Sequence, residues 1–139
     1  MSKHPANLVD DLAQAWNRHD MEAFSSLFED EARFDNVVGM FWRSRDEIRG
    51  AHAHTQATIF EDSVLAVAAV EETALGPSLV ALHAHWLLTG HAGPDGRPEA
   101  PRNGVLLLVA RETESGGWKV AIAQNSDAIP GVVTRPQQA

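Results

Sequence analysis

The 139-residue sequence contains no cysteine. Disulfides, a thiolate nucleophile and a cysteine-ligated metal are therefore excluded. Positive charge is also scarce, because 11 lysine and arginine residues face 19 acidic ones and the formal net charge is −8. Arg102, Arg111 and Lys119 are too scattered along the chain to form a basic patch. Nucleic acids and acidic membranes bind through such patches, so neither is expected as a partner.

Long apolar runs are missing as well. No stretch approaches the roughly 20 residues that cross a bilayer as a helix. The start of the chain, MSKHPANLVDD, lacks the apolar core of a secretory signal. A cytoplasmic protein is therefore predicted. The sequence also has no glycine-rich phosphate loop, no G-x-S-x-G elbow and no dinucleotide-binding fingerprint, so we expect no cofactor.

What is present is the composition of a globular domain, 44% hydrophobic and 22% charged. A chain of this length buries about two thirds of its unfolded surface and is typical of one domain. We predict a single domain over residues 1–127. A C-terminal tail with two prolines follows as residues 128–139.

The first half of the chain has apolar residues at helical spacing. They predict an amphipathic helix over residues 7–18, and Asp20 is placed to cap a short second helix. That second helix is expected to carry Met21, Phe24, Leu27 and Phe28. The stretch EDEARFDNVVGMFW then predicts a strand, a turn at Gly39 and a second short strand. A third helix should begin at Ser44, which has Glu47 at capping-box spacing. Its inner face is expected to carry Ile48, Ala51, His52, Thr55 and Ile59.

From residue 63 onward the hydrophobic period is two, as in strands. Four strands in an antiparallel meander are expected, SVLAVAAVEETA, SLVALHAHWLLTGHA, NGVLLLVARETE and GWKVAIAQNSD. Helices followed by strands predict an α+β domain with the helices on one face of a single sheet. One strand is apolar on both sides, with Val105 and Leu107 on one and Leu106 and Leu108 on the other. A second copy is therefore expected to cover the outer face, giving a homodimer through the sheet.

This order of elements resembles the nuclear-transport-factor-2-like (SnoaL-like) cone fold, and most closely its SgcJ/EcaC family. The resemblance covers about residues 8–127 and rests on NVVGMFWRSRDEIRGAH, WLLTG and GWKVAIAQNS. It implies three N-terminal helices packed on a strongly curved mixed or antiparallel sheet, around a conical pocket. Relatives include isomerases, dehydratases, cyclases and modules that only bind, so the fold does not decide the function. The family more often has an apolar residue where this chain has Asp35, so Asp35 inherits no role.

His52 is the candidate catalytic residue. On the predicted third helix it shares a stripe with Ile48 and Thr55 and points into the cone, where an imidazole can act as base or acid near neutral pH. The alternative is a buried histidine that only satisfies one hydrogen-bond partner. His54 lies about 200° further round the helix and is expected at the surface. The two histidines therefore cannot bind one metal ion.

His83 and His85 lie two residues apart on a predicted strand, so they project to the same side and could ligate a metal. No third ligand is evident in the sequence. The other side of that strand, with Ala84 and Trp86, is more apolar and should face the core. We expect the two histidines on the partner-facing side and no metal site, and we keep a metal-dependent enzyme as a third hypothesis.

The pocket wall is expected to be aromatic. Trp42, Phe60 and Trp86 are the predicted ligand contacts, although some of the nine aromatic residues must serve only as core. Asn36 is expected to reach the pocket. Its neighbour Asp35 should point away from the pocket unless a bulge intervenes, because adjacent strand residues face opposite sides.

Gln124 and Asn125 face opposite ways on the last strand, so at most one of them can reach the pocket. The alternation with Trp118, Val120 and Ile122 favours Gln124. A likeness to the calmodulin-kinase association domain favours Asn125. The choice stays open at this point.

Together these residues predict a cofactor-independent protein that binds an apolar, polyketide- or steroid-like small molecule. If it is catalytic, the chemistry is proton transfer in an isomerisation, dehydration or cyclisation. His52 would be the base or acid, and Asn36 with Gln124 or Asn125 would bind an oxygen. The alternative is a non-catalytic dimeric module for binding or assembly.

Overall fold

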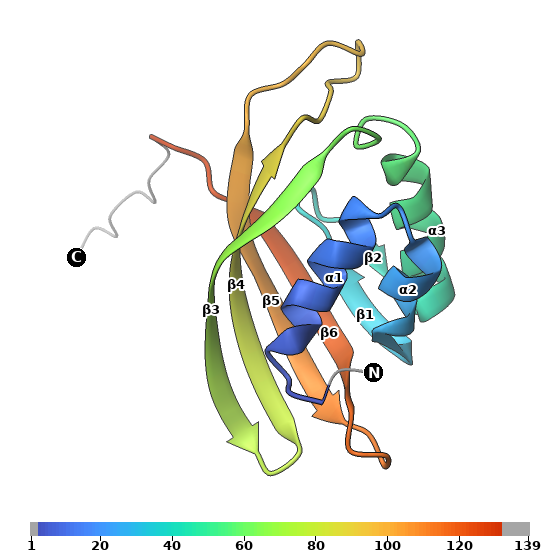
Figure 1. Ribbon diagram of the computed structural model, residues 1–139, viewed down its shortest axis with the longest axis vertical. Helices are drawn as coiled ribbons and strands as arrows, with labels where there is room; N and C mark the ends of the chain where they lie inside the picture. Colours follow the sequence, from blue (N-terminus) through green and yellow to red (C-terminus); the bar gives the residue numbers. More distant parts are fainter. Residues whose placement is uncertain (1–2, 132–139) are drawn as a thin grey trace, which may run out of the picture.

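The computed structural model describes residues 3–131, so residues 132–139 of the predicted tail lie outside it. Six strands form one sheet in the order β2-β1-β6-β5-β4-β3, with three helices against one face (Figure 1). In chain order the elements are α1 (Asn7–Asn17), α2 (Met21–Ser26), β1 (Phe28–Asp35), β2 (Phe41–Trp42), α3 (Arg45–Gln56), β3 (Val64–Gly76), β4 (Leu79–Thr89), β5 (Arg102–Glu112) and β6 (Trp118–Asp127). None of the helices within residues 3–131 is both long and apolar enough to span a bilayer.

Side-chain caps fix where two of the helices begin. The Asp20 carboxylate accepts a hydrogen bond of 2.9 Å from the Ala23 N–H at the start of α2. The Ser44 hydroxyl accepts one of 3.1 Å from the Glu47 N–H at the start of α3. The Glu47 carboxylate in turn accepts from the Arg43 N–H at 2.6 Å, one residue before the cap. Both predicted helix starts are confirmed.

Two predicted helix ends were wrong. α2 ends at Ser26 rather than running through Leu27 and Phe28, because Phe28 begins β1 and pairs with Val120 of β6. α3 ends at Gln56, so Ile59 lies in the turn after the helix and not on its face.

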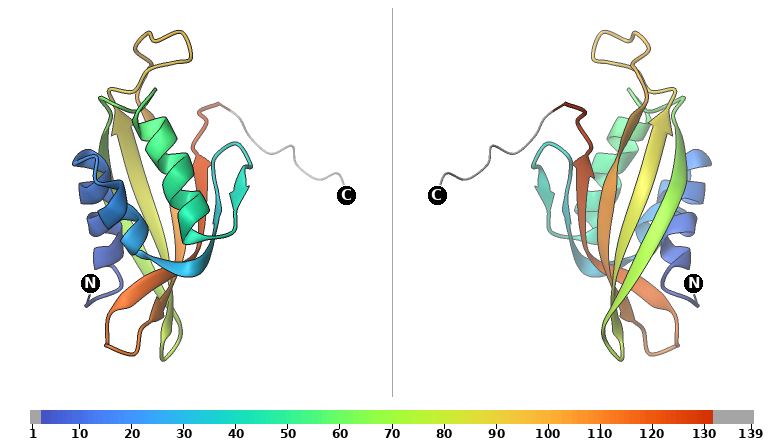
Figure 2. Two further views of the ribbon diagram at one scale, coloured as in Figure 1. Left: turned by 90° about the vertical axis from the view of Figure 1, so that its right-hand side faces the viewer. Right: turned by 90° about the vertical axis from the view of Figure 1, so that its left-hand side faces the viewer.

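The sheet is mixed and curved. β3 to β6 form the predicted antiparallel meander, and β1 joins β6 in parallel with Asp35 beside Gln124. Extra residues interrupt the register at Ala68 in β3 and at Ala121 in β6. Such bulges bend and twist a strand. Figure 2 shows the sheet curving around the helices, which lie over one of its faces and leave the other without a helix.

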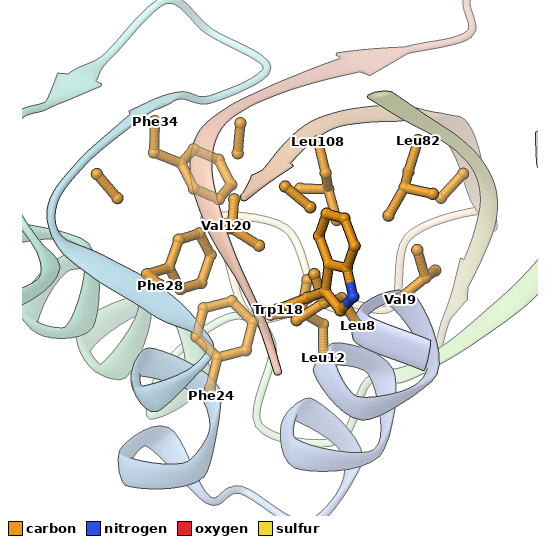
Figure 3. Close-up of a cluster of buried hydrophobic side chains, with 14 of the residues drawn as sticks. Leu8, Val9, Leu12, Phe24, Phe28, Phe34, Leu82, Leu108, Trp118 and Val120 are labelled. Atoms are coloured by element: carbon orange, nitrogen blue, oxygen red, sulfur yellow. The ribbon is translucent and has the colours of Figure 1, made fainter. Parts of the chain in front are cut away.

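The core lies between the helices and the concave face of the sheet (Figure 3). Its largest fully buried side chains are Phe28, Leu8, Ile48, Leu82, Leu108 and Val120. Burying one such side chain stabilises the fold by about 1.5–3 kcal/mol. Because these residues come from both the helices and the sheet, the core joins the two layers.

The convex face of the sheet carries apolar side chains without a cover in the single chain. Ile122 is 50% exposed and Leu87 is 40% exposed. The cross-strand register places Val109 opposite Ile122 on this face. His85 is exposed and alternates with the buried Trp86, so it also lies here.

Asn17 fastens the end of α1 to β3, the edge strand of the sheet. Its amide NH₂ donates to the Leu65 carbonyl at 2.9 Å, and its amide oxygen accepts from the Leu65 N–H at 2.8 Å. Both backbone groups of Leu65 are thereby satisfied by one side chain.

Candidate functional site

A cavity of about 180 Å³ lies between the helices and the concave face of the sheet. Most of its wall is apolar, and its aromatic members include Trp16, Phe24, Phe34, Trp42, Phe60 and Trp86. The polar side chains that reach it are Asn36, His52, Thr55, Arg102 and Asn125. An apolar cavity with a few polar groups is the usual form of a small-molecule site. An apolar cavity of about 150 Å³ is large enough for benzene, so this one suits a ligand of one or two rings.

α3 places His52 at this cavity with its tautomer fixed. Its Nδ1 lies 2.7 Å from the Ile48 carbonyl oxygen, one turn earlier in the helix. A carbonyl can only accept, so Nδ1 carries the hydrogen and Nε2 of the neutral ring carries the lone pair. Burial lowers the pKa of His52 below 6.5, and the hydrogen bond to Ile48 opposes this only in part. The ring is therefore neutral at pH 7.

Aromatic rings surround His52. Its ring centroid lies 4.8 Å from that of Phe34, 5.0 Å from that of Phe24 and 5.2 Å from that of Trp42. These rings come from β1, α2 and β2. An apolar setting of this kind disfavours the charged imidazolium, which is the physical cause of the lowered pKa.

Asn36 follows β1 and holds the turn that leads to β2. Its side-chain oxygen accepts hydrogen bonds from the Val38 N–H at 3.0 Å and from the Met40 N–H at 2.8 Å. Gly39 has φ +83°, a left-handed conformation that favours glycine, so the predicted turn at this residue is confirmed. The same Asn36 side chain lines the cavity.

Trp86 and Asn125 are joined across the sheet. The indole Nε1–H of Trp86 donates a hydrogen bond of 2.8 Å to the Asn125 side-chain oxygen. The indole lies against the β5 backbone at Gly104, where an added Cβ would come 2.5 Å from its Cζ2 and closer still to the Ser126 carbonyl oxygen. Only glycine fits beneath this ring.

Gln124 does not line the cavity and Asn125 does, so the residue favoured by strand alternation is not the one found there. Val120 pairs with Ala110 and Ile122 pairs with Val109, which leaves Ala121 as an extra residue. This bulge reverses the alternation. Beyond it Asn125 faces the cavity, whereas Gln124 is exposed on the other side.

Arg102 is a cavity residue that the sequence reasoning missed. Its guanidinium forms an ion pair with Asp127, at 2.7 Å and 2.9 Å to the two carboxylate oxygens. Its Cζ also lies 6.0 Å from the ring centroids of Phe60 and Trp86. The one feature of the sequence that could have indicated Arg102 is its position as a charged residue at the start of an apolar strand.

Arg102 and Asp127 also line a second, open hollow. The segment after β4 and the residues that follow β6 form its sides. His91, 4% exposed, contributes a buried Nδ1 that has no hydrogen-bond partner in the described part of the chain. Arg102 therefore lies at the boundary between the inner cavity and this outer hollow.

The remaining candidates lie elsewhere. Asp35, His83 and His85 do not line the cavity, and His54 is exposed on α3. Over residues 3–131 no three histidine, aspartate or glutamate side chains are grouped so that they could hold a metal ion.

Comparison with known proteins identifies relatives of this fold. The model of the SnoaL-like domain matches residues 9–110. An uncharacterised protein with a cystatin-like fold from Caulobacter vibrioides is 30% identical, with a TM-score of 0.82 over 90% of this chain and 87% of its own. An NTF-2-like protein of unknown function from Shewanella oneidensis MR-1 is 20% identical, with a TM-score of 0.71 over 88% of this chain and 95% of its own.

A proposed scytalone dehydratase from Novosphingobium aromaticivorans DSM 12444 is also similar. It is 13% identical, with a TM-score of 0.78 over 94% of this chain and 86% of its own. At such identity the likeness shows the fold alone. No curated protein matches the sequence.

The cone fold expected from the sequence is thus confirmed, while the finer resemblance to the SgcJ/EcaC family stays a prediction. The matched segment extends from α1 into β5 and contains most of the cavity residues. The chain belongs to the SnoaL-like domain family.

Proposed function

We propose that this protein binds a small, mainly apolar ring compound in the inner cavity and transfers a proton on it without a cofactor. The observation that carries the proposal is His52, a neutral imidazole set among aromatic rings. Its Nδ1–H is engaged by the Ile48 carbonyl. The Nε2 lone pair is therefore the part of the ring left for a ligand.

The reaction that this arrangement favours is proton abstraction from a carbon next to a carbonyl group. Nε2 of His52 takes the proton, and the electron pair of the C–H bond moves toward the carbonyl oxygen. Returning the proton to a different carbon completes an isomerisation. Giving it to a departing hydroxyl group releases water and leaves a carbon–carbon double bond. Asn36 and Asn125 would bind the oxygen on which negative charge develops.

The volume of the cavity limits the size of the ligand. About 180 Å³ suits one or two rings rather than a complete steroid skeleton, so the smaller polyketide-like compounds are favoured. The wall supplies stacking surface from Trp42, Phe60 and Trp86. One protein with a similar fold is a proposed scytalone dehydratase, and a dehydration is among the reactions proposed here.

The functional unit is proposed to be a homodimer. Apolar side chains such as Ile122 and Leu87 are exposed on the convex face, while the helices cover only the concave face. A second copy packed on this face would remove them from water. The cavity lies on the other side of the sheet from that face, so both protomers could bind ligand.

The experiment compares the wild type with His52→Phe on a bicyclic β-hydroxy ketone, with the conjugated enone followed by ultraviolet absorbance and binding followed by NMR. Wild type should bind and convert the compound, and His52→Phe should bind it without conversion. His54→Phe, an exposed position on the same helix, is the matched control and should convert it normally. Binding without conversion by the wild type would favour the non-catalytic binding module. Conversion by His52→Phe would overturn the role of His52.

A further inference from the structure

Helix α3 presents hydrogen-bond acceptors to the cavity. Nδ1–H of His52 is held by the Ile48 carbonyl at 2.7 Å, which leaves Nε2 as an acceptor. The Thr55 hydroxyl donates to backbone carbonyls of the same helix, 3.3 Å from that of Ala51 and 3.2 Å from that of His52. Its lone pairs are what remain for the cavity. Both side chains line the cavity.

The sheet side presents hydrogen-bond donors. The Asn36 oxygen accepts from the backbone N–H groups of Val38 and Met40, and the Asn125 oxygen accepts from the indole N–H of Trp86. Backbone and indole N–H groups can only donate, so each amide must turn its oxygen toward them. The orientation of both amides is thus fixed by their partners. The NH₂ end of each is left for a ligand.

The backbones of Asn36 and Asn125 are neighbours. Asp35 pairs with Gln124 in the parallel register of β1 and β6, and the next residue on each side is Asn36 and Asn125. Neighbouring strands lie about 4.8 Å apart, so two NH₂ groups at this position can donate to one oxygen. Arg102 adds a third group that can only donate, at the boundary with the outer hollow.

From this opposition of acceptors and donors, we infer that the ligand is a hydroxy ketone of one or two rings, held in one orientation. Its hydroxyl donates to His52 or Thr55 on α3, and its carbonyl accepts from the amide pair of Asn36 and Asn125 at the sheet. This inference rests on the proposed function and names the chemical class of the ligand. In this orientation the two amide donors stabilise the negative charge that develops on the carbonyl oxygen.

Four bicyclic probes of one skeleton test the inference: a phenolic hydroxytetralone, tetralone, hydroxytetralin and tetralin. Dissociation constants are measured by NMR titration of the wild type. The hydroxytetralone should bind roughly three- to tenfold more tightly than either compound with a single polar group, which is the effect of one added hydrogen bond. Tetralin should bind most weakly.

Two variants isolate the amide donors. Asn36→Asp and Asn125→Asp keep the oxygen that the turn and Trp86 require but replace the NH₂ by a second acceptor oxygen. Each should lose the preference for the ketones over their matched non-ketones and keep a cooperative thermal transition. Gln124→Glu makes the same chemical change one residue away on the opposite face and should leave all four dissociation constants unchanged.

The outcomes separate the two proposals. Equal binding of all four probes by the wild type would overturn the donor–acceptor arrangement and leave the proposed binding cavity standing. If both asparagine variants still prefer the ketones, the donor–acceptor arrangement is likewise overturned and the proposed binding cavity still stands. If none of the probes binds, the proposed function is overturned and this inference with it.

Discussion

The backbone of Gly104 lies so close to the indole ring of Trp86 that a Cβ on Gly104 would come 2.5 Å from the ring. This contact holds the indole where its N–H reaches Asn125, 2.8 Å away. A residue without a side chain therefore positions two residues of the cavity wall. A Cβ at this position would also clash with the Ser126 carbonyl oxygen. Because that oxygen belongs to the backbone, it cannot move to another rotamer as a side chain could.

We predict that Gly104→Ala destabilises the protein by about 3 kcal/mol, because both the indole and the β6 backbone must move. Urea denaturation measures the change. Gly50→Ala is the matched control. Gly50 lies within α3 and an added Cβ there has nothing within 4 Å, so this variant should gain about 1 kcal/mol. Equal effects at the two positions would contradict the contact with Trp86.

The lowered pKa of His52 predicts how stability depends on pH. In the unfolded chain His52 takes up a proton near pH 6.5. In the folded chain its lowered pKa keeps the ring neutral to a more acidic pH. The unfolded state therefore binds more protons on acidification, and the wild type loses stability as the pH falls below 6.5. His52→Phe fills the same aromatic surroundings without a titrating group. Its free energy of unfolding, measured at a series of pH values, should fall less steeply with acid than that of the wild type.

The ion pair of Arg102 with Asp127 should couple the cavity to the end of β6. Both side chains are 29% exposed, so solvent screens their attraction in part. A double-mutant cycle with Arg102→Gln and Asp127→Asn should give a coupling free energy of about 1 kcal/mol, smaller at high salt. A coupling of zero at low salt would show that the pair adds nothing to stability. The same cycle with Arg97 and Asp95, an exposed pair at 3.7 Å, serves as the reference and should give less.

The proposed dimer predicts that Ile122→Lys yields a monomer. Ile122 is 50% exposed on the convex face, so the change leaves the core intact but places a charge in the proposed interface. Molar mass from light scattering after size-exclusion chromatography gives the result. Val38→Lys, at a position 75% exposed in the turn between β1 and β2, is the control and should leave the molar mass unchanged. A monomeric wild type would contradict the proposal directly.

The sequence predicted those parts of the fold that local chemistry determines. Asp20 and Ser44 begin helices because their side chains reach N–H groups three residues away, and Gly39 allows a turn through its own backbone. The inward position of His52 follows from helical spacing, which a capped helix preserves. Each of these depends on residues close together in the chain.

Other parts depend on contacts that no local pattern records. Strand alternation favoured Gln124 over Asn125 because it could not include the extra residue at Ala121, which reverses the alternation, and a bulge has no fixed sequence signal. Arg102 reaches the cavity only because β5 lies between β4 and β6 and brings it near Trp86 and Asp127. The parallel pairing of β1 with β6, which brings Asn36 beside Asn125, likewise joins the two ends of the domain.

The double hydrogen bond between Asn17 and Leu65 has a consequence for solubility. An edge strand offers its free N–H and C=O groups to any other chain that can add a strand there, and growth by repeated addition leads to fibres. β3 is 13 residues long and has alanine, valine and leucine along much of its length. At Leu65 both groups are already taken by the Asn17 amide, so an incoming strand would have to displace the end of a helix before it could pair. The Asn17 carboxamide thereby hinders the addition of another strand to this edge at Leu65, and so opposes aggregation.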